Sequence, residues 1–368
     1  MNPKKILSSY LIRQFLISFF TVLFVIMSII LLFDAIELLR RTASKDYIGF
    51  FDVFQMAICK QPQLLNMILP FIFMIATMMT FYKLSKSSEL VIIRAAGVSI
   101  WGFLPPVLYT SLVIGVINMT MINPISSFMF EQYHKMEEAN KLKVSSSMVF
   151  SKSGLWLKEI KDDNRHIVIR AKSARQNQYT LNLREITILE LTEKNKPIRT
   201  IEAYKGELVK DFITLSDVKI MTPGQKTEKN ETLKYPTKLT IGRIQENFAD
   251  PDTLSFWELP GYIHFFESAG FSAVKHKMYF LTLLFSPFML MSMVLVAAVF
   301  SMQPNNRKGG VLKLVVGGVT SGFIVYFFTN IINAYGTNGT IPIYLAAIGP
   351  SMVASLISIS LLLHLEDG

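Results

Sequence analysis

The chain has 368 residues, of which 51% are hydrophobic and only 17% are charged, and its formal net charge is +10. Average soluble proteins carry about 25% charged residues, so this composition argues against a soluble protein. Residues 123–277 hold 24 of the 37 Lys and Arg residues and 20 of the 27 Asp and Glu residues, a net charge of only +4. A nucleic-acid-binding domain would concentrate positive charge there, so the charge distribution argues against that class too.

The charge deficit is gathered in uncharged runs that are long enough to cross a bilayer. An apolar stretch of about 18 residues or more without charges is typical of a transmembrane helix. The last uncharged run, 314–363, is long enough for two spans and is divided by turn-forming residues at 333–342. We therefore predict six spans, at residues 14–33, 61–82, 99–122, 279–302, 314–334 and 342–363.

The connector between the second and third predicted spans, residues 83–97, contains an apolar block that is too short to cross a membrane. Ser87 or Ser88 can cap a short helix there, and Glu89 then lies at the positive end of that helix. Gly97 is a natural terminator. The connector is therefore predicted to contain a short helix at residues 88–97.

Two interpretations of this short helix remain open. Leu90 and Ile93 fall near one face together with the small residues Ala95 and Ala96. The helix could rest on the lipid interface, or its apolar side could dock into a groove of a partner protein while Glu89 pairs with a basic residue of that partner. A chain that pumps without its own motor would need the second arrangement.

Two local signals lie inside the predicted spans. Pro105 and Pro106 are predicted to kink the third span. Gly318 and Gly322 form a Gly-x-x-x-Gly pattern in the fifth, and small residues at this spacing allow helices to approach closely. The pattern does not say whether the second helix belongs to this chain or to a partner.

Residues 123–277 are predicted to form a soluble all-β domain inserted between spans 3 and 4, which leaves 1–122 and 278–368 as the membrane domains. Several short segments alternate apolar and polar residues and are rich in β-branched side chains. Because their connections are short, we expect antiparallel strands in a curved sheet, sandwich or roll. The segment Asp252–Gly270 is predicted to be an amphipathic helix, capped by Asp252 or Thr253, that leads back to the membrane. The predicted strands are Arg165–Ala171, Glu185–Leu191, Ile198–Ala203 and Phe212–Met221.

Basic residues in the short connections predict the orientation. If the N-terminus is cytoplasmic, nine Lys and Arg residues lie in the inside segments and four in the outside ones. This asymmetry favours both termini in the cytoplasm and places the β domain on the far side of the membrane. The first apolar run is too long for the core of a cleaved signal peptide.

The sequence lacks the common catalytic motifs. It contains no phosphate-binding Gly-x-x-x-x-Gly-Lys-Ser/Thr, no His-Glu-x-x-His and no Gly-x-Ser-x-Gly. The five histidines are scattered, Cys59 is the single cysteine, and the spans lack charges apart from Asp34 and Glu37 at the end of the first. We therefore expect no catalytic residue, no metal site and no cofactor bound by this chain, and ion-coupled transport is disfavoured.

Three segments in the expected order resemble the lipopolysaccharide export permeases LptF and LptG, and the LptG branch more closely. Ser88–Gly97 ("SELVIIRAAG") is similar to the family's coupling helix. Ser153–Glu159 ("SGLWLKE") is similar to the entry into its periplasmic domain, and Asp250–Gly270 ("DPDTLSFWELPGYIHFFESAG") to the segment that precedes span 4. The resemblance covers nearly the whole chain.

The resemblance implies a permease subunit of an ABC transporter in the inner membrane of Gram-negative bacteria. Its partners would be an LptB-type ATPase dimer, which binds ATP and Mg²⁺, a paralogous LptF-type permease, and LptC-type and LptA-type jellyroll proteins. The inserted domain would then be a periplasmic β-jellyroll. The complex would extract lipopolysaccharide and pass it along these jellyrolls, a step in building the cell envelope.

The resemblance also implies roles for individual residues. Ser88, Glu89, Leu90, Ile93, Arg94 and Gly97 would form the contact with the ATPase. Arg40 and Arg41 would attract lipid A phosphates, although such a pair can also be an ordinary headgroup anchor.

Two further positions are less clearly assigned. Gly318 and Gly322 would line a lateral opening toward the partner permease or pack within the chain. Asp34 departs from the family pattern, which has a basic residue near this place; the lipid contact shifts, or Asp34 pairs with a neighbour.

One alternative from another class is a membrane-anchored scaffold or assembly factor whose β domain binds partners. Such a protein would need no coupling helix. A membrane-embedded lipid-modifying enzyme is disfavoured because no catalytic cluster is present.

Overall fold

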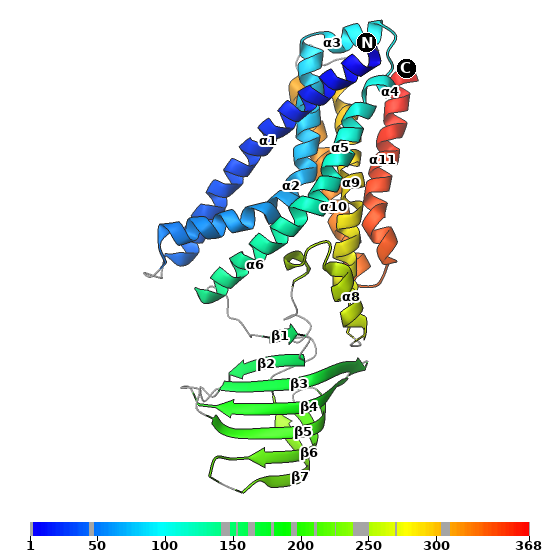
Figure 1. Ribbon diagram of the computed structural model, residues 1–368. Helices are drawn as coiled ribbons and strands as arrows, with labels where there is room; N and C mark the ends of the chain where they lie inside the picture. Colours follow the sequence, from blue (N-terminus) through cyan, green and yellow to red (C-terminus); the bar gives the residue numbers. More distant parts are fainter. Residues whose placement is uncertain are drawn as a thin grey trace. The chain divides into compact units, whose positions relative to one another are not determined.

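A computed structural model describes residues 3–43, 48–140, 148–151, 154–160, 166–177, 180–192, 197–209, 212–224, 226–237, 250–268, 271–302 and 310–367. The chain divides into two compact units (Figure 1). A helical unit comprises Met1–Leu142, Pro251–Pro260 and Val274–Gly368, and a β unit comprises Lys143–Asp250 and Gly261–Ala273.

The helical unit confirms the six predicted spans. Among the described residues, six helical segments are long and apolar enough to cross a membrane. The helices of this unit are α1 (Pro3–Thr42), α2 (Phe50–Lys86), α3 (Glu89–Ala95), α4 (Ile100–Phe103), α5 (Pro105–Ile117), the π-helix η1 (Asn118–Ile122), α6 (Asn123–Ala139), α9 (Val274–Ser301), α10 (Gly310–Thr337) and α11 (Ile343–Asp367).

The predicted start of the β domain, residue 123, needs correction. The helical unit runs on to Leu142, and Pro251–Pro260 also belong to it. The reason is that α6 continues the third span beyond η1 without a break and buries polar and aromatic side chains, among them Tyr133. Residues whose polarity had indicated a soluble domain therefore belong to the helical unit.

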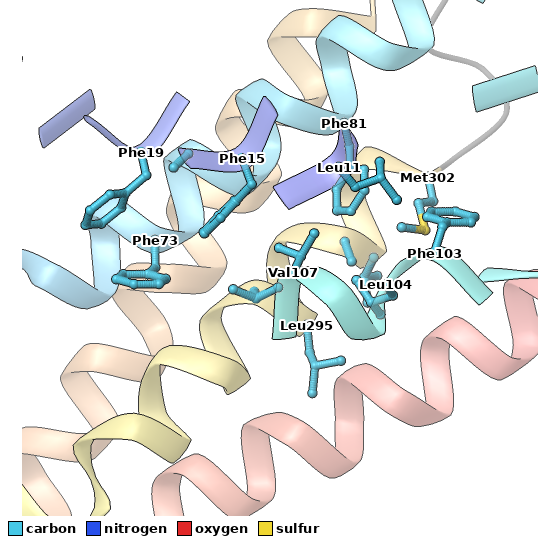
Figure 2. Close-up of a cluster of buried hydrophobic side chains, with 14 of the residues drawn as sticks. Leu11, Phe15, Phe19, Phe73, Phe81, Phe103, Leu104, Val107, Leu295 and Met302 are labelled. Atoms are coloured by element: carbon cyan, nitrogen blue, oxygen red, sulfur yellow. The ribbon is translucent and has the colours of Figure 1, made fainter. Parts of the chain in front are cut away.

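Large aromatic side chains hold the helical unit together (Figure 2). Phe15 and Phe19 of α1 pack against Phe73 of α2, and the ring centroids of Phe19 and Phe73 lie 4.9 Å apart. Phe81 of α2 meets Phe103 of α4 edge to face at 6.1 Å. Since apolar lipid offers no hydrophobic drive for helices to associate, such close packing is what fixes their arrangement.

The third predicted span bends at Pro105 and Pro106, as expected, because the prolines separate the short helix α4 from α5. The short helix α4 ends at Phe103, the chain bends at Leu104, and the two prolines occupy the first turn of α5. Proline is favoured there because the first backbone N–H groups of a helix have no intrahelical acceptor. The third span is distorted farther along, at the π-helix η1.

In the part of the β unit that the structure describes, seven strands form an antiparallel sheet, which confirms the predicted all-β insertion. The strands follow the order of the chain, so the sheet is a meander. The four predicted strand segments lie in β3 to β6, apart from Arg165, which is outside the described residues. The bounds of the strands are β1 (Met148–Ser151), β2 (Gly154–Ile160), β3 (His166–Asn177), β4 (Thr180–Leu191), β5 (Pro197–Val209), β6 (Phe212–Met221) and β7 (Glu228–Pro236).

A crease, meaning a level at which regular pairing between neighbouring strands is interrupted, crosses the sheet from β3 to β7. On β4 the buried positions change from Leu181 and Leu183 to Ile186 and Ile188, so two neighbouring residues, Arg184 and Glu185, both face outward. The same change of phase occurs on β5 and β6, and regular pairing is interrupted at this level on every strand from β3 to β7. Positive φ angles at Glu185 (50°) and Asp217 (57°) accompany it. The neighbouring outward residues at this level are Arg184–Glu185 on β4, Tyr204–Lys205 on β5 and Ser216–Asp217 on β6.

The sheet rolls strongly enough for β7 to reach β4. Tyr235 of β7 donates a hydrogen bond of 2.8 Å to Glu190 of β4, although β5 and β6 lie between these strands. In a flat sheet strands three places apart are about 14 Å apart. Arg199 donates two bonds of 2.8 and 2.9 Å to the same buried carboxylate, which raises the pKa of the guanidinium.

The segment after the sheet forms a shorter helix than predicted. A single 3₁₀ turn occupies Pro251–Thr253, and α8 spans Leu259–Ser268. Ser255 and Glu258, in place of Asp252 or Thr253, exchange hydrogen bonds just before α8, with Ser255 N 3.0 Å from Glu258 Oε2. Within the β unit, Phe266 of α8 and Phe271 are buried in the apolar interior of the sheet.

Candidate functional site

The predicted short helix between the second and third spans exists and lies between two left-handed residues. It is α3, and Ser88 before it has φ of 60° while Gly97 after it has φ of 79°. Gly97 adopts this conformation without strain, as predicted. Figure 1 shows α3 at the end of the helical unit where both termini also lie. At this end Glu366 of α11 accepts a hydrogen bond of 3.3 Å from Ile100 N.

The serines before α3 act differently from the prediction. Ser88 stands at the N-cap position, but its side chain makes no capping hydrogen bond. Ser87 instead donates to the carbonyl of Lys83 at 3.1 Å, so it closes the end of α2. The left-handed conformation of Ser88 turns its backbone away from capping geometry, which requires an extended residue.

The exposed apolar side of α3 differs from the side that the sequence indicated. Leu90 is buried and Ile93 packs against the core of the helical unit. Val91 and Ile92 point outward, with 50% and 65% of their surface exposed. Leu90 and Ile93 therefore attach α3 to the bundle. The surface open to a partner comprises Val91 and Ile92 together with the exposed residues 94–97.

Glu89 has a neutral partner inside the chain. The hydroxyl of Tyr10, on α1, donates a hydrogen bond of 2.7 Å to Glu89 Oε2. A hydroxyl orients a carboxylate without cancelling its charge, so Glu89 keeps the negative charge that a cationic partner would recognise. Sequence reasoning missed Tyr10 because 79 positions separate it from Glu89.

Arg40 and Arg41 lie near the C-terminal end of α1 and both contact Glu37. Arg40 Nη2 is 2.8 Å from Glu37 Oε2, and Arg41 Nε is 2.9 Å from Glu37 Oε1. The arginine side chains remain 78% and 55% exposed. One carboxylate thus holds both guanidinium groups in place and leaves most of their surface accessible.

Asp34 pairs with a neighbour, which was one of the two predicted possibilities. Its Oδ1 accepts a hydrogen bond from the ammonium of Lys60, on α2. The same ammonium lies 5.7 Å from the centre of the Tyr133 ring, on α6. Tyr133 belongs to a small buried cluster with Leu38 and Met56. Lys60 therefore links three helices at the end opposite to α3.

Gly318 and Gly322 contact α2 of the same chain. A Cβ atom at Gly318 would lie 2.5 Å from the side chain of Met78, and one at Gly322 would lie 2.6 Å from Met74. Of the two predicted alternatives, packing within the chain is therefore the one observed. A closer approach was missed: a Cβ at Gly115 would lie 2.7 Å from the backbone of Pro287 in α9.

Buried amides form a second feature that sequence reasoning missed. Asn118 of the π-helix donates to Asn66 of α2 at 3.0 Å, and Asn66 donates to Ser126 of α6 at 3.1 Å. Nearby, Trp257 Nε1 donates to the carbonyl of Thr120 at 3.0 Å. A π-helix frees backbone carbonyls of this kind. The signal available beforehand was the presence of asparagines in otherwise apolar runs.

These observations define a class: a polytopic α-helical membrane protein with an antiparallel β insertion. Residues 9–364 match the family described as "Lipopolysaccharide export system permease LptF/LptG". The chain belongs to this permease family of the lipopolysaccharide export system.

Individual relatives carry the name "Lipopolysaccharide export system permease protein LptG". The proteins of Escherichia coli strain K12 and of strain O6:H1 are each 21% identical over 376 residues, which covers 99% of both chains. The protein of Haemophilus influenzae is 23% identical over 360 residues, 94% of this chain and 95% of its own length. The likeness therefore extends through both units.

Proposed function

We propose that this chain is the transmembrane permease subunit of an ABC transporter that extracts lipopolysaccharide from the inner membrane. It passes the lipid to a bridge of periplasmic β-jellyroll domains that leads toward the outer membrane. Both termini and α3 lie in the cytoplasm, and the β unit lies in the periplasm. The observation that carries the proposal is the family match over residues 9–364 together with a docked helix, α3, that presents apolar side chains and a carboxylate.

The partner at α3 is an LptB-type ATPase dimer, which supplies ATP and Mg²⁺. Val91 and Ile92 enter a groove of the ATPase, and Glu89 pairs with a cation at its rim. Leu90 and Ile93 are buried against the bundle, so a push on α3 is transferred to α1 and α2. The rest of the assembly is an LptF-type permease with LptC-type and LptA-type jellyroll proteins.

The opposite end of the helical unit receives the lipid. Arg40 and Arg41 bind the lipid A phosphates, for which a planar guanidinium is well suited. Their exposure of 78% and 55% supports this role. Gly318 and Gly322 allow the close approach of α10 to α2.

Charge reversal at Glu89 tests the proposal. Glu89→Lys places two cations at one contact, so lipid release per ATP hydrolysed should fall at least about tenfold, since like charges at an interface cost several kcal/mol. The measurement compares ATP turnover with lipopolysaccharide release from proteoliposomes containing the whole complex. Glu131→Lys, on the exposed face of α6, is the matched control and should transport normally.

Purification in mild detergent separates the transporter from a scaffold. A permease subunit should co-purify with an ATPase in a fixed ratio, and Glu89→Lys should weaken that association. A scaffold would retain its partners through the β unit and would not respond to changes in α3. Normal transport by the Glu89→Lys complex would refute the assignment.

A further inference from the structure

The ion pair between Asp34 and Lys60 lies where the apolar part of the spans ends. Asp34 is the first charged residue after the uncharged run 14–33 of α1, and Lys60 is the last before the uncharged run 61–82 of α2. The fold brings both to one place. In a membrane, the depth at which long apolar runs give way to charged residues is the depth of the lipid headgroups.

The carboxylate of this pair is incompletely satisfied. The Asp34 side chain is only 9% exposed, and its Oδ2 atom is buried without a hydrogen bond among the described residues. The attraction within a buried ion pair repays the loss of hydration only if the remaining lone pairs are also satisfied. The ion pair therefore adds little net stability, and Asp34 satisfies the ammonium of Lys60 with only one of its two oxygens.

The ammonium group is better placed to exchange partners. The Lys60 side chain is 25% exposed, and the Tyr133 ring supports its charge from another helix. The two arginines farther along α1 are also held by an internal carboxylate, that of Glu37. Three cations at this end thus face carboxylate oxygens, in the positions that the oxygens of a bound anion would take.

We propose that Lys60 binds a phosphate group of the lipid headgroup, and that the Asp34 carboxylate pairs with the Lys60 ammonium until the lipid binds. The inference rests on the proposed function and adds a binding residue to it. A phosphate group offers three strong acceptor oxygens and up to two negative charges, so it satisfies the ammonium better than one oxygen of Asp34. The displaced carboxylate would be buried without a cation, which is costly. Headgroup binding therefore loosens the contact between α1 and α2.

Two neutral substitutions with opposite expected effects test the exchange. Asp34→Asn removes the internal competitor and should tighten binding of phosphorylated lipopolysaccharide several-fold. Lys60→Gln removes the phosphate ligand and should weaken binding about tenfold, since a hydrogen bond to a charged group contributes about 1.5 kcal/mol or more. Affinities are measured on the purified complex in nanodiscs, with the same lipid after enzymatic dephosphorylation as the comparison. Both effects should vanish with the dephosphorylated lipid.

A second ion pair provides matched controls. Glu131 and Lys135 on α6 are 2.7 Å apart and exposed, so Glu131→Gln and Lys135→Gln should leave lipid affinity unchanged. Thermal unfolding in detergent is recorded for all variants. If Asp34→Asn and Lys60→Gln change the affinity in the same direction, or not at all, the pair is only a structural link and the proposal is wrong.

The outcomes also separate this inference from the proposed function. If the wild-type complex shows no affinity for lipopolysaccharide, the proposed function fails and the inference fails with it. If the wild type prefers the phosphorylated lipid but the two variants do not diverge, only the inference fails. Inorganic phosphate is tested in a third arm: variant-dependent binding of free phosphate without variant-dependent lipid binding would assign the site to a soluble anion and overturn the proposal.

Discussion

The two ends of the helical unit treat charge in opposite ways. At the α3 end, the carboxylate of Glu89 is oriented by the neutral hydroxyl of Tyr10, so its charge is available to a partner. At the other end, the cations Arg40, Arg41 and Lys60 each contact a carboxylate of the same chain. An uncancelled charge suits a permanent docking contact. Charges that are already paired suit a ligand that must come and go, because the internal partner takes the cation back on release.

The largest effect is expected from a charge placed on the buried side of α3. Leu90→Asp buries a carboxylate without a partner and should lower the free energy of unfolding by about 3 kcal/mol. Ile92→Asp changes the exposed side of the same helix. It should leave thermal stability unchanged within about 0.5 kcal/mol but prevent co-purification of the ATPase. Equal loss of stability in both variants would contradict the assigned faces of α3.

An intermediate effect is expected from the packing that connects the two ends. Gly115→Ala brings a Cβ atom against the Pro287 backbone, which cannot rotate away, and should cost about 2 kcal/mol. Gly318→Ala meets the flexible end of Met78 and should cost less than about 1 kcal/mol. Thermal unfolding of the two variants in one detergent checks the order. A larger loss for Gly318→Ala would mean that the methionine contact is the rigid one.

The smallest effect is expected at the hydroxyl beside Glu89. Tyr10→Phe removes one hydrogen bond to a half-exposed carboxylate, worth about 1 kcal/mol, so lipid release per ATP should fall roughly threefold to fivefold. Tyr109→Phe is the matched control because Tyr109 is 65% exposed on α5. The ratio of release to hydrolysis is the informative quantity, since a purely structural role would change stability and leave the ratio intact. An unchanged ratio would show that Glu89 does not depend on Tyr10.

Runs of like residues made the architecture predictable. Uncharged stretches located all six spans, because a helix in the hydrocarbon core of a bilayer is apolar on all sides. Alternation located β3 to β6, because a sheet that buries one face alternates apolar and polar residues along each strand. The boundary at residue 123 failed since α6 is amphipathic and buries its polar residues between helices. Polarity alone does not distinguish such a helix from a soluble domain.

Site residues were predictable by position but not by partner. The short helix, its left-handed Gly97 and the basic pair at Arg40 and Arg41 could all be located from the sequence. Lys60 was not identified as a site residue, because its role depends on its contact with Asp34, which lies 26 positions away in the sequence. The outward face of α3 was also misassigned, since a helix that is apolar on all sides gives no sign of which side the bundle covers.

The crease in the β unit restricts how this domain can change in length. The strands from β3 to β7 interrupt their pairing at the same level, and β4, β5 and β6 shift their alternation there, so that apolar side chains stay on one side along each of these three strands. Losing or gaining one residue within a single strand would turn part of that strand inside out. Insertions and deletions that accumulate during evolution should therefore be confined to the connections between strands, or occur in all five strands together.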